Sequence, residues 1–118
     1  MLYVGGPHFA QGDGEICGTT IEASLTTRIQ VWVEPELGVT SPLLETPEAW
    51  ITHGFGTGLD QAMRMAAKQM LWLMRTHLQM SADDAYSLAS VAMDLSVTQV
   101  VDAMLGCHAA ISRKIFDA

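Results

Sequence analysis

An alternation of apolar and polar side chains between Thr20 and Val33 most constrains what this chain can fold into. Strict period-two alternation over this length predicts a β-strand with one face buried and the other in water or against a partner. Pro35, Gly38 and Pro42 then predict a loop. The odd-numbered positions of the strand are Ile21, Ala23, Leu25, Thr27, Ile29, Val31 and Val33. We expect these odd-numbered side chains to face the core. A one-residue shift in strand register would move the whole apolar set to the solvent face.

Two helices are predicted in the second half of the chain. The first runs from about Asp60 to Leu78, with apolar residues at steps of three and four and basic residues on the other side. The second begins after Ser81, which we expect to cap the helix with Asp84 at the reciprocal third position. The predicted apolar stripes are Met63, Ala66, Ala67, Met70 and Met74 in the first helix, and Ala85, Leu88, Ala89, Ala92 and Leu95 in the second.

Further strands are predicted on both sides of the helices. A strand at Ala49–Phe55 precedes the glycines that lead into the first helix. β-Branched residues after Asp94 favour a short strand, and Cys107 to Ile115 a closing one. We therefore predict an α+β fold, with antiparallel strands and a pair of amphipathic helices packed on one side. A length of 118 residues predicts a single domain, 1–118.

Composition excludes several classes of partner. The net charge of -7 and the pI near 4.7 exclude a basic surface for nucleic acid or anionic lipid. The most apolar stretch, Ala62 to Leu78, is interrupted by charged residues and is not a membrane span. The N-terminal residues 1–8 have neither a basic region nor a long apolar run, so no secretory signal is expected. Cys17 and Cys107 form no CxxC pair, which indicates reduced thiols in the cytoplasm.

Chemically active side chains are concentrated between His8 and Glu15. This short stretch holds an imidazole, a carboxamide and two carboxylates, and glycines flank Asp13 on both sides. Glycine permits positive φ and lets backbone N–H groups approach a ligand closely, so the stretch predicts a binding loop. We expect His8, Gln11, Asp13 and Glu15 to line one polar pocket. The alternative is a tight hairpin turn with Asp13 and Gly14 at its centre.

The same region resembles a known family. The run from His8 to Glu22, HFAQGDGEICGTTIE, is similar to the HAAQGDGEVCGTAIE signature of the acetamidase/formamidase family. Gly54–Leu59 falls where that family has a TGIG-type turn before a long helix. Ser81–Tyr86, Ser90–Leu95 and Thr98–Asp102 are similar to its EDAY, SVAGDL and QVVD segments. The resemblance therefore spans nearly the whole chain in order.

The resemblance implies hydrolysis of short linear amides, such as formamide or acetamide, to ammonia and a carboxylate. Such a reaction needs a group that polarises the carbonyl, an activated water and a proton for the leaving nitrogen. Asp13 and Glu15 are the candidate base and acid, and they would share a face if they lay in a strand. Members of the family are associated with metal ions, so a divalent ion, zinc or calcium, is expected with His8 among its ligands. The expected substrate-binding residues are Gln11, Gly12, Gly14 and Cys17.

Two further expectations concern the extent of the site and its partners. The resemblance covers only the C-terminal part of the family's longer chains, which implies a truncated or partner-dependent amidase, or alternatively a non-catalytic binding or assembly module. Cys17 could instead be a nucleophile, although no nearby lysine or histidine activates it. Low charge and a strand without upstream neighbours predict self-association, most simply as a homodimer.

The remaining histidines and two aspartates have simpler interpretations. His53 is expected as a hydrogen-bonded histidine of the core and not as a ligand, and His77 as a cap near the C-terminus of the first helix. His108 lies beside Cys107, a pair that could bind metal only with further ligands. Asp94 and Asp102 are either turn residues or neighbours of Glu15.

Overall fold

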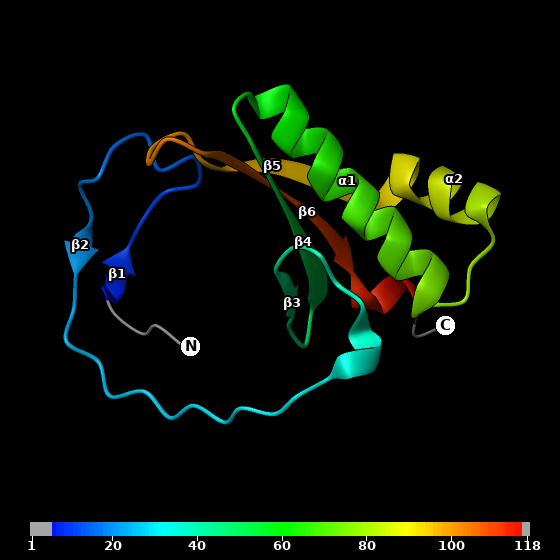
Figure 1. Ribbon diagram of the computed structural model, residues 1–118, viewed down its shortest axis with the longest axis horizontal. Helices are drawn as coiled ribbons and strands as arrows, with labels where there is room; N and C mark the ends of the chain where they lie inside the picture. Colours follow the sequence, from blue (N-terminus) through cyan, green and yellow to red (C-terminus); the bar gives the residue numbers. More distant parts are fainter. Residues whose placement is uncertain (1–5, 117–118) are drawn as a thin grey trace.

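The computed structural model describes residues 6–116, arranged as two antiparallel sheets and two α-helices (Figure 1). Residues 1–5, part of the segment considered above for a secretory signal, lie outside the described residues. The larger sheet has the strand order β3-β4-β6-β5, and the smaller sheet consists of β1 and β2. The strands are β1 (His8–Ala10), β2 (Ile21–Glu22), β3 (Leu43–Glu45), β4 (Ala49–Gly56), β5 (Met93–Gln99) and β6 (Leu105–Ser112). The helices are α1 (Leu59–Thr76) and α2 (Ala82–Ala92), with short 3₁₀ turns at Pro35–Leu37 and Arg113–Ile115.

Helix α1 lies across one face of the larger sheet and supplies half of the buried core residues (Figure 1). Its buried stripe is formed by Ala62, Ala66, Met70, Leu73 and Met74, which pack toward β4 and β6. Met63 was expected in this stripe but lies at its margin, with 37% of its surface exposed. The predicted α+β class is confirmed, and so is the prediction that the helices pack on one side of the sheet. In the described part of the chain, no helix is long and apolar enough to cross a membrane.

Helix α1 approaches the sheet unusually closely at Gly54. A Cβ atom added there would lie 2.1 Å from the carbonyl oxygen of Ala62 and 2.4 Å from the nitrogen of Ala66. Next to this contact, the buried hydroxyl of Thr52 donates a 2.8 Å hydrogen bond to the Ala66 carbonyl oxygen. The close packing and this hydrogen bond fix the position of the helix relative to β4. They also define the opposite face of β4, which carries Ile51 and His53.

Helix α2 begins as predicted. The Ser81 hydroxyl oxygen accepts a 3.1 Å hydrogen bond from the Asp84 backbone N–H, and the Ser81 hydroxyl also contacts the Asp84 carboxylate at 2.6 Å. Ala85 and Ala89 are buried against α1, but the helix ends at Ala92. Leu95, assigned to the apolar stripe of this helix, lies instead on β5 and is exposed. The C-terminal end of the predicted helix, which includes Asp94, therefore belongs to the start of β5.

The predicted strand at 20–33 is wrong beyond its first residues. Only Ile21 and Glu22 form a strand, and residues 23–34 are extended without regular pairing. Val31 and Val33, expected in the core, are 71% and 88% exposed. Alternation specifies which side chains share a face, but a strand also needs a neighbour for its backbone N–H and C=O groups. Apart from Ala23, whose N–H donates a 3.0 Å hydrogen bond to the Pro7 carbonyl oxygen, this segment forms no ladder with another strand among the described residues.

The extended segment enlarges the molecule. It passes round an open arc from β2 to the 3₁₀ turn before β3 (Figure 1). The radius of gyration is 15.5 Å, against about 13.5 Å for a compact domain of this length. Residues 23–34 thus carry apolar side chains away from the core formed by α1 and the sheet.

Candidate functional site

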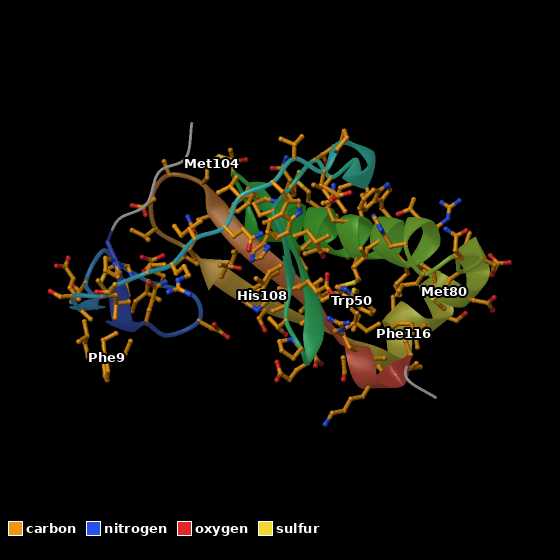
Figure 2. All side chains as sticks on the ribbon, turned by 90° about the horizontal axis from the view of Figure 1, so that it is seen from below. Phe9, Trp50, Met80, Met104, His108 and Phe116 are labelled. Carbon is orange, nitrogen blue, oxygen red and sulfur yellow. The ribbon has the colours of Figure 1, made fainter. Side chains whose placement is uncertain are left out.

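The predicted binding loop connects the two strands of the small sheet. β1 and β2 pair antiparallel, and the Thr20 hydroxyl donates a 3.1 Å hydrogen bond to the Ala10 carbonyl oxygen. Phe9 points away from the remainder of the chain (Figure 2), with 78% of its surface exposed. Residues 11–20 form the connection, so this is a long loop and not the two-residue hairpin considered as the alternative.

A tight turn at Gly12–Glu15 forms the centre of the loop. The Glu15 N–H donates to the Gly12 carbonyl oxygen at 3.2 Å, which places Asp13 and Gly14 in the middle of the turn. Gly14 has φ +92°, a value that glycine adopts without the steric cost of a side chain. Asp13 and Glu15 therefore lie on a turn, and the expectation that they share the face of a strand is wrong.

The turn is attached to the edge of the larger sheet. The Gly14 N–H donates a 3.2 Å hydrogen bond to the Thr98 carbonyl oxygen, and the Val100 N–H donates to the Gly14 carbonyl oxygen at 3.0 Å. These bonds form an isolated parallel bridge between Gly14 and Gln99. Gly14 is buried by this contact, whereas Asp13 beside it is exposed. The end of β5 thus holds the backbone of the turn and leaves its carboxylates accessible.

Five of the predicted site residues, Gly12 among them, surround one shallow, open pocket. Gln11, Asp13, Glu15 and Cys17 line a depression of about 260 Å³, together with neighbouring residues of the loop. The lining is completed by Gly12, Ile16 and Thr19. Gly14 is not part of the lining, because its N–H donates to β5. The structure therefore brings the two carboxylates and the carboxamide to one place.

His8 was expected to line this pocket, but it is not part of the lining and reaches the pocket only through its contact with Gln11. Its Nδ1 lies 2.6 Å from the Gln11 Oε1, and because an amide oxygen only accepts, Nδ1–H is the donor. This leaves the His8 Nε2 without a proton in the neutral ring. It also assigns the Gln11 Nε2 as the amide group that remains to donate to a ligand.

Cys17 is exposed and has an altered acidity. Hydrogen bonding from the backbone and then from the side chain of Thr19 lowers the pKa of the Cys17 thiol below its usual range. The nearby Glu15 carboxylate opposes this shift, because a second negative charge disfavours the thiolate. The lowering agent is therefore Thr19, a residue that a search for an adjacent lysine or histidine does not find. Cys107, in contrast, is buried, and burial raises the pKa of its thiol.

A metal ion does not find a complete set of ligands here. Within residues 6–116, no group of three His, Cys, Asp or Glu side chains is placed to hold one. The expected ion at His8 would need ligands beyond this set, so no chemical step below is assigned to it. Asp94 lies at the far end of β5 from the turn, and Asp102 lies in the β5–β6 loop with φ +68°. Neither lines the pocket.

Two residues that position the loop were not singled out from the sequence. In the sequence, Thr98 and Val100 stand out only as β-branched residues of a predicted strand. Their contribution is made by backbone atoms, which pair with Gly14. Backbone pairing leaves no residue-type signal, so a sequence pattern does not reveal it. The nearest available signal was the glycine with positive φ, which marks a backbone that can approach another closely.

Comparison with known proteins shows the family to which the chain belongs. The chain combines an α+β fold with a carboxylate-bearing loop that is attached to the edge of the larger sheet. The model of the acetamidase/formamidase family matches residues 1–118. The chain therefore belongs to the acetamidase/formamidase family, whose members hydrolyse amides. The comparison with curated proteins gives no match.

Solved structures with the same fold include three acetamidase-type proteins. An acetamidase from Bacillus halodurans is 30% identical, with a TM-score of 0.79 over 93% of this chain and 37% of its own. An acetamidase from Yersinia enterocolitica is 24% identical, with a TM-score of 0.72 over 92% of this chain and 33% of its own. A predicted acetamidase/formamidase from Thermoanaerobacter tengcongensis is 24% identical, with a TM-score of 0.64 over 70% and 28%. The chain spans about a third of the length of these proteins.

Proposed function

We propose that this chain carries part of the active site of an amidase that hydrolyses short linear amides. One observation carries the proposal: the turn held by β5 gathers Gln11, Asp13 and Glu15 around a single pocket. The family supports amide hydrolysis, and the similarity to a solved acetamidase favours acetamide-like substrates. Reaction there would add water across the amide C–N bond and release ammonia and a carboxylate.

The residues of the pocket have distinct roles in this proposal. Gln11, oriented by His8, donates its amide N–H to the substrate carbonyl oxygen, where negative charge develops. One carboxylate, Asp13 or Glu15, takes the proton of the attacking water, and the other returns a proton to the leaving nitrogen. Glu15 is partly buried and Asp13 exposed, so the two carboxylates have different environments. Cys17 lies on the same rim and contacts the substrate.

Ammonia release from formamide and acetamide tests the proposal. Asp13→Asn and Glu15→Gln should each lower the rate by about 10²-fold or more, because each removes a proton-transfer group. Glu22→Gln is the matched control, since Glu22 is an exposed carboxylate on β2 outside the pocket. Equal rates in all three variants would contradict the proposal. A wild-type chain that releases no ammonia would favour the alternative, a non-catalytic binding or assembly module.

We further propose that the extended segment 23–34 pairs with a second copy of the chain. Two copies paired antiparallel about Val31 would place each Arg28 opposite the partner subunit's Glu34, and Ile29 opposite the partner subunit's Val33. Such pairing would satisfy the open backbone groups and cover the apolar side chains that are exposed in the single chain. The charge pattern supports a two-fold homodimer.

A further inference from the structure

Two histidines occupy directly opposed positions on neighbouring strands, away from the loop site. His53 on β4 and His108 on β6 are register partners, and their ring centroids are 6.1 Å apart. Both lie on the face of the sheet opposite α1, since the flanking Thr52 and Ala109 are buried beneath the helix. His108 is found near the middle of the sheet (Figure 2). Both rings are partly buried.

The outer nitrogen of each ring is held by a hydrogen bond. His53 Nδ1 lies 3.1 Å from the Pro42 carbonyl oxygen, which only accepts, so this nitrogen carries the hydrogen. His108 Nδ1 lies 2.8 Å from the Thr98 hydroxyl oxygen. Pro42 precedes β3 and Thr98 belongs to β5, so these partners lie on the two outer sides of the pair. In each ring the Nδ1 atom is engaged, and Nε2, which lies across the ring from it, is the nitrogen left to bind a ligand.

We propose that His53 and His108 bind one divalent transition-metal ion of the imidazole-preferring class, such as Zn²⁺ or Cu²⁺, through their Nε2 atoms. Metal-binding histidines characteristically donate their second ring N–H to a carbonyl or other oxygen, as both rings can do here. Two imidazoles on one tetrahedral ion have centroids about 5 Å apart, so the observed 6.1 Å needs only a small side-chain rotation. Ca²⁺ prefers oxygen ligands and does not suit this pair.

The pair provides two protein ligands and leaves the other positions of the ion to water or a small ligand. Thr98 links this site to the loop site, because its hydroxyl contacts His108 and its carbonyl oxygen accepts from Gly14. Metal binding and loop position are thus connected through one residue. The proposal does not depend on amidase activity, and a binding measurement tests it separately.

Calorimetric titration of the full chain with ZnCl₂ and CaCl₂ is the test. We expect one Zn²⁺ site and no Ca²⁺ binding, with His53→Gln and His108→Gln each weakening Zn²⁺ at least tenfold. Thr98→Val should weaken it about tenfold by removing the hydroxyl oxygen that holds His108 Nδ1. Thr76→Val, which removes a remote helical hydroxyl, should not. His8→Ala should leave the affinity unchanged. Loss of binding in His8→Ala, or unchanged binding in both glutamine variants, would overturn the proposal.

A second measurement needs no variant, in case a histidine substitution unfolds the chain. Substoichiometric Cu²⁺ should broaden the ring NMR signals of His53 and His108 before those of His8 and His77. The ¹⁵N shifts of the metal-free protein should also show His53 as the Nδ1–H tautomer. Broadening that begins at His8 or His77, or an Nε2–H tautomer at His53, would contradict the site.

Discussion

The backbone N–H of Gly14 donates a 3.2 Å hydrogen bond to the carbonyl oxygen of Thr98, and this contact joins the loop site to the larger sheet. Around it, a φ of +92° at Gly14 lets the turn reach the strand end without a side chain in the way. The loop therefore depends on β5 for its position, although the two are far apart in sequence.

Gly14→Ala should loosen this attachment. An alanine forced to φ +92° is strained by about 1 kcal/mol or more. The amide of Val100, which donates to the Gly14 carbonyl oxygen, should then exchange its hydrogen roughly fivefold faster or more. Gly12→Ala is the control, since a Cβ there meets nothing within 4 Å and needs no positive φ. Equal exchange at Val100 in both variants would show that the bridge does not depend on glycine.

Thr19→Val should raise the pKa of the Cys17 thiol toward its ordinary value. The hydroxyl of Thr19 favours the thiolate, so its loss favours the neutral thiol, while the backbone contribution remains. The rate of alkylation by iodoacetamide should rise with pH at a lower midpoint in the wild type than in the variant. In denaturant the two midpoints should coincide. Buried Cys107 should not react in the folded chain, and a wild-type midpoint equal to that of unfolded protein would contradict the assignment.

Gly54→Ala should destabilise the whole fold. The added methyl group would overlap the backbone of α1 at Ala62 and Ala66, and helix backbone cannot rotate aside as a side chain can. We expect a loss of about 2 kcal/mol or more in the free energy of unfolding, measured in urea. Gly106→Ala meets side chains of Gln99 and Phe55 at 3.1 Å and beyond, so it should cost less. The reverse order would mean that α1 does not pack on Gly54.

Association through the extended segment predicts a concentration-dependent mass. Light scattering should show particles heavier than the 12.8 kDa chain at tens of micromolar. Val31→Asp should shift the equilibrium to monomer, since it places two like charges together at the proposed two-fold axis. Thr40→Asp, outside the segment, serves as the control. A wild-type mass of 12.8 kDa throughout the dilution series would exclude the dimer.

The elements of the larger sheet and the helices could be predicted because they bury one another. The stripe at Ala66, Met70 and Met74 and the cap at Ser81 are local patterns with local consequences, and both are present. The strand at residues 20–33 could not be predicted in the same way. Its alternation is real, but pairing depends on a neighbour, and among the described residues only Ile21 and Glu22 pair with another strand, β1.

The residues that line the candidate pocket could be predicted from the sequence, but the contacts that hold the loop in place could not. The loop residues Gln11, Asp13 and Glu15 stand out because glycines surround polar groups, and they do share a pocket. Their support by Thr98 consists of main-chain bonds, to which residue identity contributes nothing. The pairing of His53 with His108 was likewise hidden, because cross-strand register is set by tertiary structure.

The parallel bridge between Gly14 and Gln99 has a consequence for the order of folding. It closes residues 14–99 of the 118-residue chain into one loop. Contacts so distant in sequence form slowly, because closing a long loop costs conformational entropy before the contact stabilises it. The helices and the β4–β6 pair can assemble from nearer contacts. The turn at Gly12–Glu15 would then be a late-maturing part of the molecule, acquired only when β5 is already in place to receive it.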